Sequence, residues 1–323
     1  MCTAILRNKS AHLFGRTLDV EARMSEEIVI TPRRFRIGFA YEEAEAEHTA
    51  LIGTALMRNG MPLYYDAMNE YGLAAVALSF VGNAVYRRAK EGARNVASFE
   101  LISWVLTKCK TLSEARELLS GANVTAEAFD AGLAPSPLHW MIADKSGALT
   151  VEPLAEGLRI YENKVGVLTN NPPFSYHLTH LCDYMSLSPA QPENTVCPSA
   201  DLKPYSRGMG ALGLPGDASS ASRFVRAAFL NAHTASPTES GEVSTFFHIM
   251  DGVAQPLGCS RTGEGKNTRT LYTSCMDMDA LTYSFTTYNN RRIREVRLSQ
   301  SLLDTSSVTS YPMYTEEDVY RLN

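Results

Sequence analysis

The order of strand-like and helix-like segments along the chain is the feature that most constrains its fold. Short β-branched or alternating runs predict strands, and apolar residues at helical spacing predict helices. Strand-like runs dominate the first 85 residues, a pair of helices follows, and the rest continues as strands, helices and strands again. The predicted strands are 1–6, 12–19, 27–33, 49–57, 72–80, 138–143, 148–152, 158–162, 165–169, 268–273, 282–287 and 293–298.

Four helices are predicted between these strands. They cover 95–109, 113–119, 219–231 and 243–253. Ser98 lies near the start of the first helix, and Ser219 is a favourable cap for the third. The alternation of strand runs with helix runs predicts an α+β fold of one domain over residues 1–323, with two antiparallel sheets between helix layers. The first strand would then be central in its sheet, with its first residue exposed at one end.

The stretch 184–215 is predicted to lack regular structure. It contains five prolines together with several serines and glycines. An irregular segment of this length is typical of functional or interface loops. We therefore expect it to take part in function or in contacts between subunits.

Composition and charge exclude several classes of protein. Hydrophobic residues make up 45% and charged residues 20% of the chain, which is ordinary for a soluble globular protein. The net charge of −5 and the lack of a Lys/Arg block argue against a nucleic-acid partner. No run of about 18 apolar residues is present, so we expect no membrane span. The N-terminus does not read as a signal peptide, and the chain is expected to be cytoplasmic.

The cysteines and histidines show no metal-ligand spacing. The six cysteines, at positions 2, 109, 182, 197, 259 and 275, contain no C-x-x-C pair, so neither a metal site nor a disulfide framework is indicated. We expect the five cysteines after Cys2 to be buried free thiols in a reducing cytoplasm. His177 and His180 lie three residues apart, but nothing near them completes a metal site. We expect no metal and no organic cofactor.

Cys2 would become the first residue of the protein if Met1 is removed. It would then carry both a thiol nucleophile and a free α-amine that can accept a proton near neutral pH. The first two predicted strands form a hairpin, which brings Arg16 and Asp19 beside residue 2. A cation near a thiol favours the thiolate, and a carboxylate can hold the amine by hydrogen bonding. From these residues alone, an inert cysteine in a strand is the commoner interpretation.

A series of short motifs follows one order along nearly the whole chain. The motifs are Met-Cys-Thr at 1–3, Phe-Gly-Arg-x-x-Asp at 14–19, Thr-Pro-Arg at 31–33, Met-Asn-Glu at 68–70, Gly-Leu at 72–73, Leu-His-Trp at 138–140, Gly-Val-Leu-Thr-Asn-Asn-Pro at 166–172, Gly-Leu-Pro-Gly-Asp at 213–217 and Ser-Arg-Phe-Val-Arg at 222–226. In this order they resemble the choloylglycine hydrolase family, which contains bile salt hydrolases and penicillin V acylases. The resemblance implies an N-terminal-nucleophile (Ntn) hydrolase fold, a four-layer αββα sandwich.

The resemblance implies roles for five side chains. Cys2 matches the nucleophile, Arg16 the arginine beside the thiol, and Asp19 the aspartate that orients the α-amine. Asn170 matches the asparagine that donates to the oxyanion, and Arg223 the buried arginine that closes the charge network. Each residue also has an ordinary structural interpretation. Arg16 and Asp19 could be an exposed pair on a hairpin, Asn170 part of a turn, and Arg223 an exposed residue in a helix's first turn.

The second oxyanion donor falls at Ser79, where this chain departs from the family pattern. Bile salt hydrolases commonly carry asparagine at this position and penicillin acylases tyrosine. The backbone N–H of Ser79 can donate whatever the side chain, so catalysis is still expected.

The implied reaction is hydrolysis of the amide bond of a glycine- or taurine-conjugated bile acid. The segment Tyr205-Ser-Arg-Gly-Met-Gly is close to the bile salt hydrolase subgroup. The alternative is a penicillin V acylase or a hydrolase of another N-acyl amide, such as an acyl homoserine lactone, and a non-catalytic ligand-binding relative is a third hypothesis. The stretch 184–215 matches a family segment that reaches across subunits, which implies a homotetramer acting on a small-molecule substrate.

Overall fold

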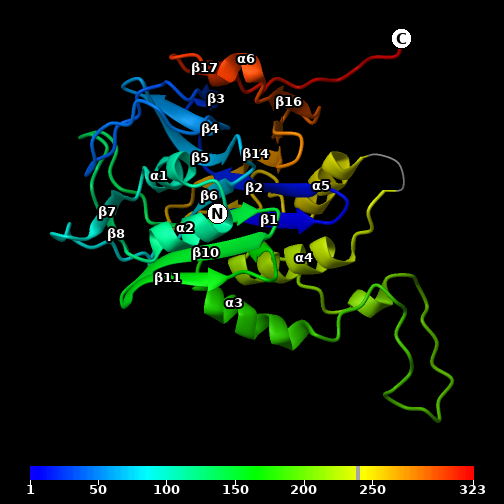
Figure 1. The fold of residues 1–323 in the computed structure, drawn as a ribbon. Helices are drawn as coiled ribbons and strands as arrows, with labels where there is room; N and C mark the ends of the chain where they lie inside the picture. Colours follow the sequence, from blue (N-terminus) through cyan, green and yellow to red (C-terminus); the bar gives the residue numbers. More distant parts are fainter. Residues whose placement is uncertain (238–240) are drawn as a thin grey trace.

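Two antiparallel sheets lie face to face between layers of helices in the computed structural model, which describes residues 1–237 and 241–323 (Figure 1). One sheet has seven described strands in the order β12-β1-β2-β14-β15-β16, with β13 paired to β14. Its strands are β1 (Cys2–Asn8), β2 (His12–Val20), β12 (Val167–Leu168), β13 (Ser260–Arg261), β14 (Asn267–Asp277), β15 (Thr282–Thr287) and β16 (Arg294–Arg297).

The second sheet has eight described strands in the order β11-β10-β9-β6-β5-β4-β3-β17. These are β3 (Glu26–Thr31), β4 (Leu51–Arg58), β5 (Met61–Asn69), β6 (Ala74–Ser79), β9 (Leu138–Asp144), β10 (Gly147–Leu154), β11 (Gly157–Glu162) and β17 (Thr309–Pro312). A separate parallel pair joins β7 (Arg94–Ala97) to β8 (Ala122–Thr125).

The helices cover the outer faces of the two sheets. Helices α1 (Leu101–Lys108) and α2 (Leu112–Leu119) pack on the eight-stranded sheet, and α4 (Ser220–His233) and α5 (Glu242–Asp251) pack on the seven-stranded sheet. Helix α3 (Phe174–Leu181) packs against α4, and α6 (Gln300–Leu303) is a single turn. The short 3₁₀ turns are Cys182–Tyr184 and Met209–Ala211. No helix in the described ranges is long and apolar enough to span a membrane.

Strand β6 shows how the sequence builds two cores. Ala74, Val76 and Leu78 belong to the core between the sheets. The alternate residues Ala75 and Ala77 belong to the core beneath α1 and α2. Because side chains of a strand alternate between faces, a strand buried on both sides reads as a continuous apolar run.

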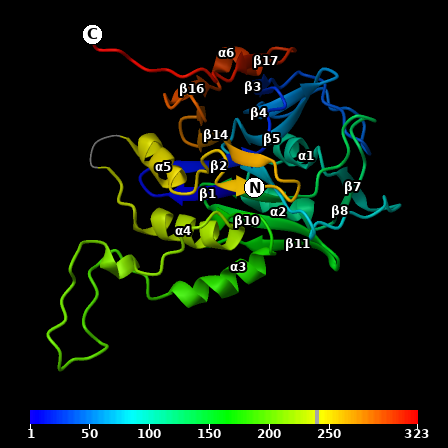
Figure 2. The same ribbon diagram turned by 180° about the vertical axis from the view of Figure 1, so that it is seen from behind.

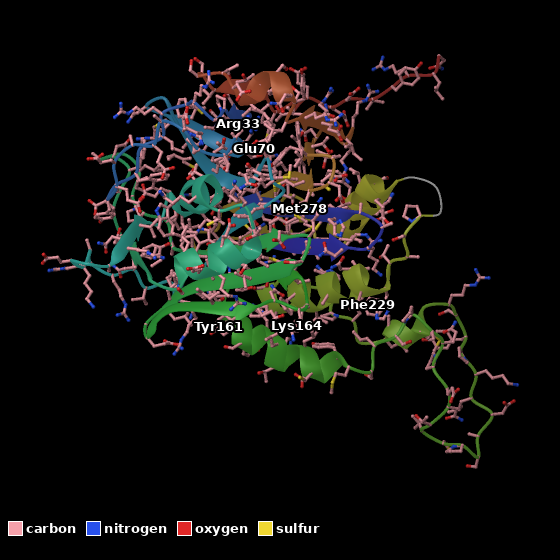
Figure 3. The ribbon with its side chains drawn as sticks, viewed as in Figure 1. Arg33, Glu70, Tyr161, Lys164, Phe229 and Met278 are labelled. Atoms are coloured by element: carbon pink, nitrogen blue, oxygen red, sulfur yellow. The ribbon has the colours of Figure 1, made fainter. Side chains whose placement is uncertain are left out.

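Two motifs that are far apart in sequence meet at the ends of neighbouring strands of the eight-stranded sheet. Arg33 follows β3 and Glu70 follows β5, and Arg33 Nε donates to Glu70 Oε1 over 3.0 Å (Figure 3). The same Oε1 accepts the backbone N–H of Ala50, just before β4. This cluster holds the ends of three strands together and lies apart from Cys2.

The sequence prediction of two antiparallel sheets between helix layers is confirmed, but the first predicted helix begins too early. Residues 94–97 form β7, in which Val96 and Ala97 pair with Val124 and Thr125 of β8. Helix α1 starts only at Leu101. The apolar residues near 96 are therefore buried by strand pairing, which sequence periodicity cannot distinguish from a helix face over so short a run.

The sequence prediction missed six elements, namely β5, β8, β13, β17, α3 and α6, and the first strand lies elsewhere in its sheet than expected. Strand β5 follows β4 through a turn at Asn59 and Gly60, both with positive φ, and α3 follows a proline pair. Strand β1 is an interior strand but second from the edge of its sheet. The expectation of an exposed first residue is wrong, since Cys2 is 2% exposed.

The predicted irregular stretch 184–215 is confirmed apart from its short 3₁₀ turns. It projects from the sandwich as a long loop in both views, while the N-terminus lies near the centre (Figures 1 and 2). The expectation of buried thiols holds for Cys109 and Cys275 but is wrong for the other three, which lie in the helical turn after α3 and in loops. Cys182 and Cys259 are exposed and Cys197 is half-buried.

Candidate active site

Cys2 is the first residue of β1 and lies beside Arg16 of β2. The two strands pair with Cys2 opposite Leu18 and Ala4 opposite Arg16, so the hairpin brings the guanidinium back to the thiol. Arg16 Nη2 lies 2.6 Å from Cys2 Sγ. Gly15 lets β2 approach β14 closely, because a Cβ there would lie 2.0 Å from the Ser274 carbonyl oxygen.

The buried guanidinium of Arg16 occupies the place where β5 and β6 separate. The ladder between these strands ends at the pair Asp66 and Val76. Beyond it, the carbonyl oxygens of Tyr65 and Ala77 accept hydrogen bonds from Arg16 Nη1, at 3.3 and 2.5 Å. Burial acts to lower the pKa of Arg16. The negative charges that face the guanidinium, of which Cys2 has the largest effect, outweigh burial and raise the pKa. Arg16 is therefore a fully buried cation held by backbone carbonyls.

Asn170 and Arg223 meet on the backbone of Cys2. Asn170 Oδ1 accepts the N–H of Cys2 at 2.8 Å and Nη2 of Arg223 at 2.7 Å. Arg223 Nη1 donates to the Cys2 carbonyl at 2.5 Å and to Thr3 Oγ1 at 2.6 Å. Arg223 is fully buried at the start of α4 and Asn170 is almost so. Both therefore orient the first residue of β1 rather than forming an exposed helix turn or an isolated loop.

Asp19 is buried beside the chain terminus, with its carboxylate tied to neighbouring strands. Thr270 Oγ1 donates to Asp19 Oδ1 at 2.6 Å, and Thr17 and Gln255 donate to Oδ2 at 3.2 and 3.4 Å. Its backbone N–H donates to the carbonyl of Met1 at 2.8 Å. With Met1 present, the Cys2 nitrogen is a peptide N–H that donates to Asn170. A free α-amine at Cys2 forms only when Met1 is removed.

The backbone of Ser79 faces Asn170. Phe80 N–H donates to the Pro137 carbonyl, and Leu138 N–H donates to a tyrosine hydroxyl rather than to Ser79. Ser79 and Leu138 are therefore a non-hydrogen-bonded pair, so the N–H and C=O of Ser79 both point away from β9. The Ser79 carbonyl accepts Asn170 Nδ2 at 2.8 Å. The N–H of Ser79 thus lies at the edge of β6 that faces Asn170.

A cavity of about 330 Å³ opens onto the thiol. Cys2, Arg16 and Ser79 are among the residues that line it. Its walls are mostly apolar and include Leu18, Leu63, Phe99, Phe129, Leu133 and Leu138. The arrangement offers a nucleophile, a cation and backbone donors in the wall of a mostly apolar pocket, which suits attack on the carbonyl of an apolar acyl compound.

A larger hollow lies elsewhere and contains none of these groups. Its volume is about 650 Å³, and it is lined by Asn8 and Lys9 at the far end of β1 and by Lys164 (Figure 3). We place the candidate site in the smaller cavity, because chemistry requires reactive groups and not volume. Among the described residues, no group of three or more His, Cys, Asp and Glu side chains is arranged to hold a metal ion.

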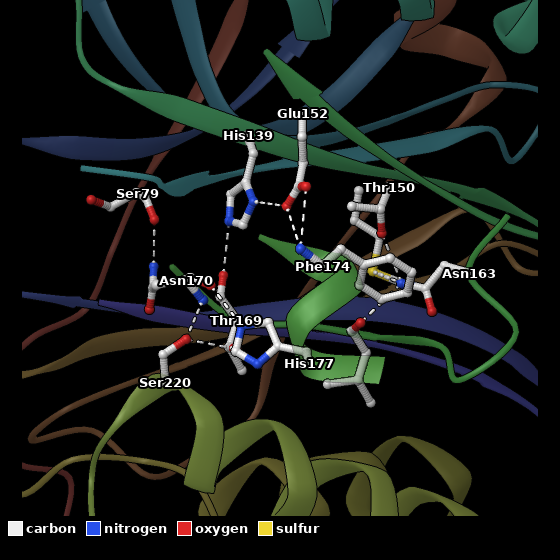
Figure 4. Close-up of polar contacts among 12 residues, drawn as sticks. Ser79, His139, Thr150, Glu152, Asn163, Thr169, Asn170, Phe174, His177 and Ser220 are labelled. Atoms are coloured by element: carbon white, nitrogen blue, oxygen red, sulfur yellow. Dashed lines mark hydrogen bonds and ion pairs between the residues drawn. The ribbon is translucent and has the colours of Figure 1, made fainter. Parts of the chain in front are cut away.

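The structure brings all six sequence-predicted site residues into one region. The interpretation of Arg16 and Asp19 as a surface pair is wrong, since both are fully buried. Sequence reasoning missed the walls of the cavity and a buried network of His139, Glu152 and His177 next to Asn170 (Figure 4). The motif Leu-His-Trp was a signal for this network, but nothing in its pattern gave His139 a partner.

A family model, related sequences and solved structures all match this chain over most or all of its length. The family "Linear amide C-N hydrolases, choloylglycine hydrolase family" matches residues 2–311. A bile salt hydrolase/transferase of Lactiplantibacillus plantarum is 44% identical over 324 aligned residues, covering 100% of both chains. The crystal structure of a conjugated bile acid hydrolase from Clostridium perfringens superposes with a TM-score of 0.93 at 32% identity over 100% of both chains. A penicillin V acylase from Agrobacterium tumefaciens, at a TM-score of 0.76 and 18% identity over 98% of this chain and 95% of its own, shares the fold.

Proposed function

The chain belongs to the choloylglycine hydrolase family of linear amide C–N hydrolases, and we propose that it hydrolyses the amide bond of glycine- or taurine-conjugated bile acids. The relatives named as bile salt or conjugated bile acid hydrolases support this substrate class. The products are the free bile acid and the amino acid or taurine.

The observation that carries the proposal is that Cys2 lines the mostly apolar cavity. A steroid acyl group is large, rigid and apolar, and it gains free energy when it leaves water for walls such as Phe99, Phe129 and Leu133. With the steroid in the cavity, the amide at the end of its side chain can reach Cys2 Sγ. Arg16 Nη2 lies at the same sulfur, where it stabilises the thiolate.

The proposed reaction starts after Met1 is removed. The thiol of Cys2 gives its proton to the new α-amine, and Asp19 and Asn170 hold that amine in place. The thiolate attacks the amide carbon, and the oxyanion that forms accepts hydrogen bonds from Asn170 Nδ2 and the Ser79 N–H. Arg223 keeps Asn170 and the Cys2 backbone aligned through its contacts to both.

Collapse of the tetrahedral species breaks the C–N bond. The α-ammonium of Cys2 protonates the departing nitrogen, which leaves as glycine or taurine. The amine then takes a proton from a water molecule that attacks the thioester. The second tetrahedral species expels the thiolate, which regains its proton, and the bile acid leaves. No group outside the chain and water is needed to balance these steps.

Steady-state kinetics on three substrates tests the proposal. We expect kcat/KM for glycocholate or taurocholate to exceed that for penicillin V by at least about tenfold. A difference of a single methylene group in an apolar pocket is already enough to change kcat/KM by about this factor. A higher kcat/KM for penicillin V, or for an acyl homoserine lactone, would assign the alternative N-acyl amide. Tight binding of a conjugate without product, by protein with a verified Cys2 N-terminus, would indicate a non-catalytic ligand-binding protein.

We further propose a cytoplasmic homotetramer in which 184–215 contacts a neighbouring subunit. The projecting loop exposes Met185, Val196 and Tyr205, with Val196 91% exposed. Apolar side chains left this exposed on a protruding segment favour burial against another surface. Size-exclusion chromatography with light scattering is expected to give four times the chain mass of 35.5 kDa. A monomeric mass would contradict the role given to the loop.

A further inference from the structure

Two histidines from different elements hold the short segment that carries Asn170 (Figure 4). His139 on β9 places Nε2 3.0 Å from the Thr169 carbonyl oxygen. His177 on α3 places Nε2 2.9 Å from the Asn170 carbonyl oxygen. A carbonyl oxygen only accepts, so each Nε2 carries the hydrogen of its bond. Two consecutive carbonyls are thus fixed from opposite sides of the segment.

A single buried carboxylate contacts His139 and the start of the helix that carries His177. Glu152 Oε1 lies 3.1 Å from His139 Nδ1, and both residues are fully buried. The same Oε1 accepts the backbone N–H of Phe174 at 3.0 Å, and Oε2 accepts it at 3.2 Å. Phe174 is the first residue of α3, the helix that carries His177. Glu152 therefore sets both the ring of His139 and the start of the helix that presents His177.

Stacking fixes the planes of both rings. His139 lies on Phe80 with ring centroids 4.2 Å apart and planes 6° from parallel. His177 lies on Phe224 at 4.8 Å and 13°. Burial lowers the pKa of His177 to about 4, so the ring is neutral at physiological pH and donates from Nε2 alone. Neither histidine lines the cavity at Cys2, so neither touches a substrate bound there.

We propose that His139, Glu152 and His177 are positioning residues that hold Asn170 so that its Nδ2 faces the developing oxyanion. The inference rests on the proposed hydrolase function. Oxyanion stabilisation depends on donors that are already in place when charge develops, so the backbone that carries Asn170 has to be rigid. Arg223 and the Cys2 N–H orient the Asn170 side-chain amide by donating to its Oδ1. The two histidines hold the main chain of the same segment by donating to its carbonyl oxygens.

Two substitutions at His177 separate hydrogen bonding from packing. His177→Phe keeps a stacking ring but removes the donor, and His177→Gln keeps a donor near the place of Nε2 but removes the ring. We expect the Phe variant to lose roughly 10- to 100-fold in kcat, with KM changed by less than about twofold, and the Gln variant to recover most of the loss. His180→Gln, one turn away on the same helix, is the matched control and is expected to keep wild-type kinetics.

Two further measurements distinguish a positioning role from a structural one. The rate of Cys2 alkylation by iodoacetamide is expected to stay unchanged in the Phe variant, because the thiol and Arg16 are intact. The affinity for the aldehyde analogue of cholic acid, whose thiol adduct carries an oxyanion, is expected to fall in parallel with kcat. Should His177→Phe be too unstable to purify, Ser220→Ala removes the acceptor for the Asn170 N–H and is expected to show the same pattern on a smaller scale.

Different experimental outcomes would contradict the proposed substrate and the proposed positioning role. Wild-type protein that cleaves neither glycocholate nor taurocholate would contradict the proposed substrate. Active wild-type protein with an unimpaired His177→Phe variant would overturn the positioning role and leave the substrate standing. Equal losses of kcat, alkylation rate and thermal stability in the Phe and Gln variants would also overturn it, because packing alone would then account for the effect.

Discussion

Arg16 Nη2 and Cys2 Sγ are in direct contact at 2.6 Å, and both residues are almost completely buried. The other donors of Arg16 reach backbone carbonyls of Thr17, Tyr65 and Ala77. Cys2 is the first of the groups whose negative charge raises the pKa of Arg16, and Tyr272, Asp66 and Asp19 act in the same direction. The register of the β1–β2 hairpin therefore places a buried cation directly at the thiol.

Replacing Arg16 is expected to slow alkylation of Cys2. Arg16→Leu removes the cation, so we expect the rate with iodoacetamide at pH 7 to fall about tenfold or more, and Arg16→Lys to retain part of it. Peptide mass spectrometry measures the rate at Cys2 and at exposed Cys182 in the same sample. The rate at Cys182 is the internal control and should not change. An unchanged rate at Cys2 in Arg16→Leu would show that the contact does not activate the thiol.

Replacing the nucleophile is expected to abolish turnover while leaving the fold intact. Cys2→Ser changes one buried atom, so we expect an unchanged circular dichroism spectrum and a loss in kcat of about 10³-fold or more. Turnover of glycocholate measured on purified protein checks the prediction. Wild-type-like turnover by this variant would rule out thiol catalysis.

Active protein is expected to lack Met1. A retained methionine leaves the Cys2 nitrogen as an amide, which cannot accept the proton of the thiol. Inhibition of methionine aminopeptidase during expression should give protein at least about 10²-fold less active, the usual contribution of one general base. Intact mass spectrometry assigns the two forms, and later treatment with the aminopeptidase should restore activity in proportion to cleavage. An active species that retains Met1 would contradict the role of the amine.

Shortening a wall of the cavity is expected to weaken substrate binding more than catalysis. Phe129 packs edge-on against Phe99, with ring centroids 5.3 Å apart. Phe129→Ala removes apolar contact with the acyl group, so we expect KM for glycocholate to rise about tenfold with a smaller change in kcat. Phe229→Ala, on α4 and outside the cavity lining (Figure 3), is the matched control. Equal KM values for the two variants would place the steroid elsewhere.

Stability is expected to fall with acidification in the range set by His177. Burial lowers its pKa from 6.5 to about 4, so between these values the unfolded chain binds a proton that the folded chain does not. The contribution of His177 to the free energy of unfolding is therefore greatest above pH 6.5. It decreases as the pH falls toward 4, by a few kcal/mol in total. Urea denaturation at several pH values should show a smaller acid loss in His177→Gln than in wild type. Identical pH dependence would contradict the burial argument.

The site could be predicted from sequence because its reactive residues lie on local, recognisable patterns. Cys2 and Arg16 occur on adjoining strands of one predicted hairpin, and the register of that hairpin brings them together. The helix with Arg223 is predicted from its capping serine, and the structure confirms it as α4. The motif order then related these segments to a known family.

Local pattern indicated which residues could react and where most of the strands and helices lie. Only the tertiary structure decided what surrounds them. His139, Glu152 and His177 come from β9, β10 and α3, and the cavity walls come from segments between positions 18 and 138, so no local pattern shows which residues of either set meet. Their burial arises when two sheets stack and helices cover them, since long-range packing selects side-chain partners that no short window of sequence specifies.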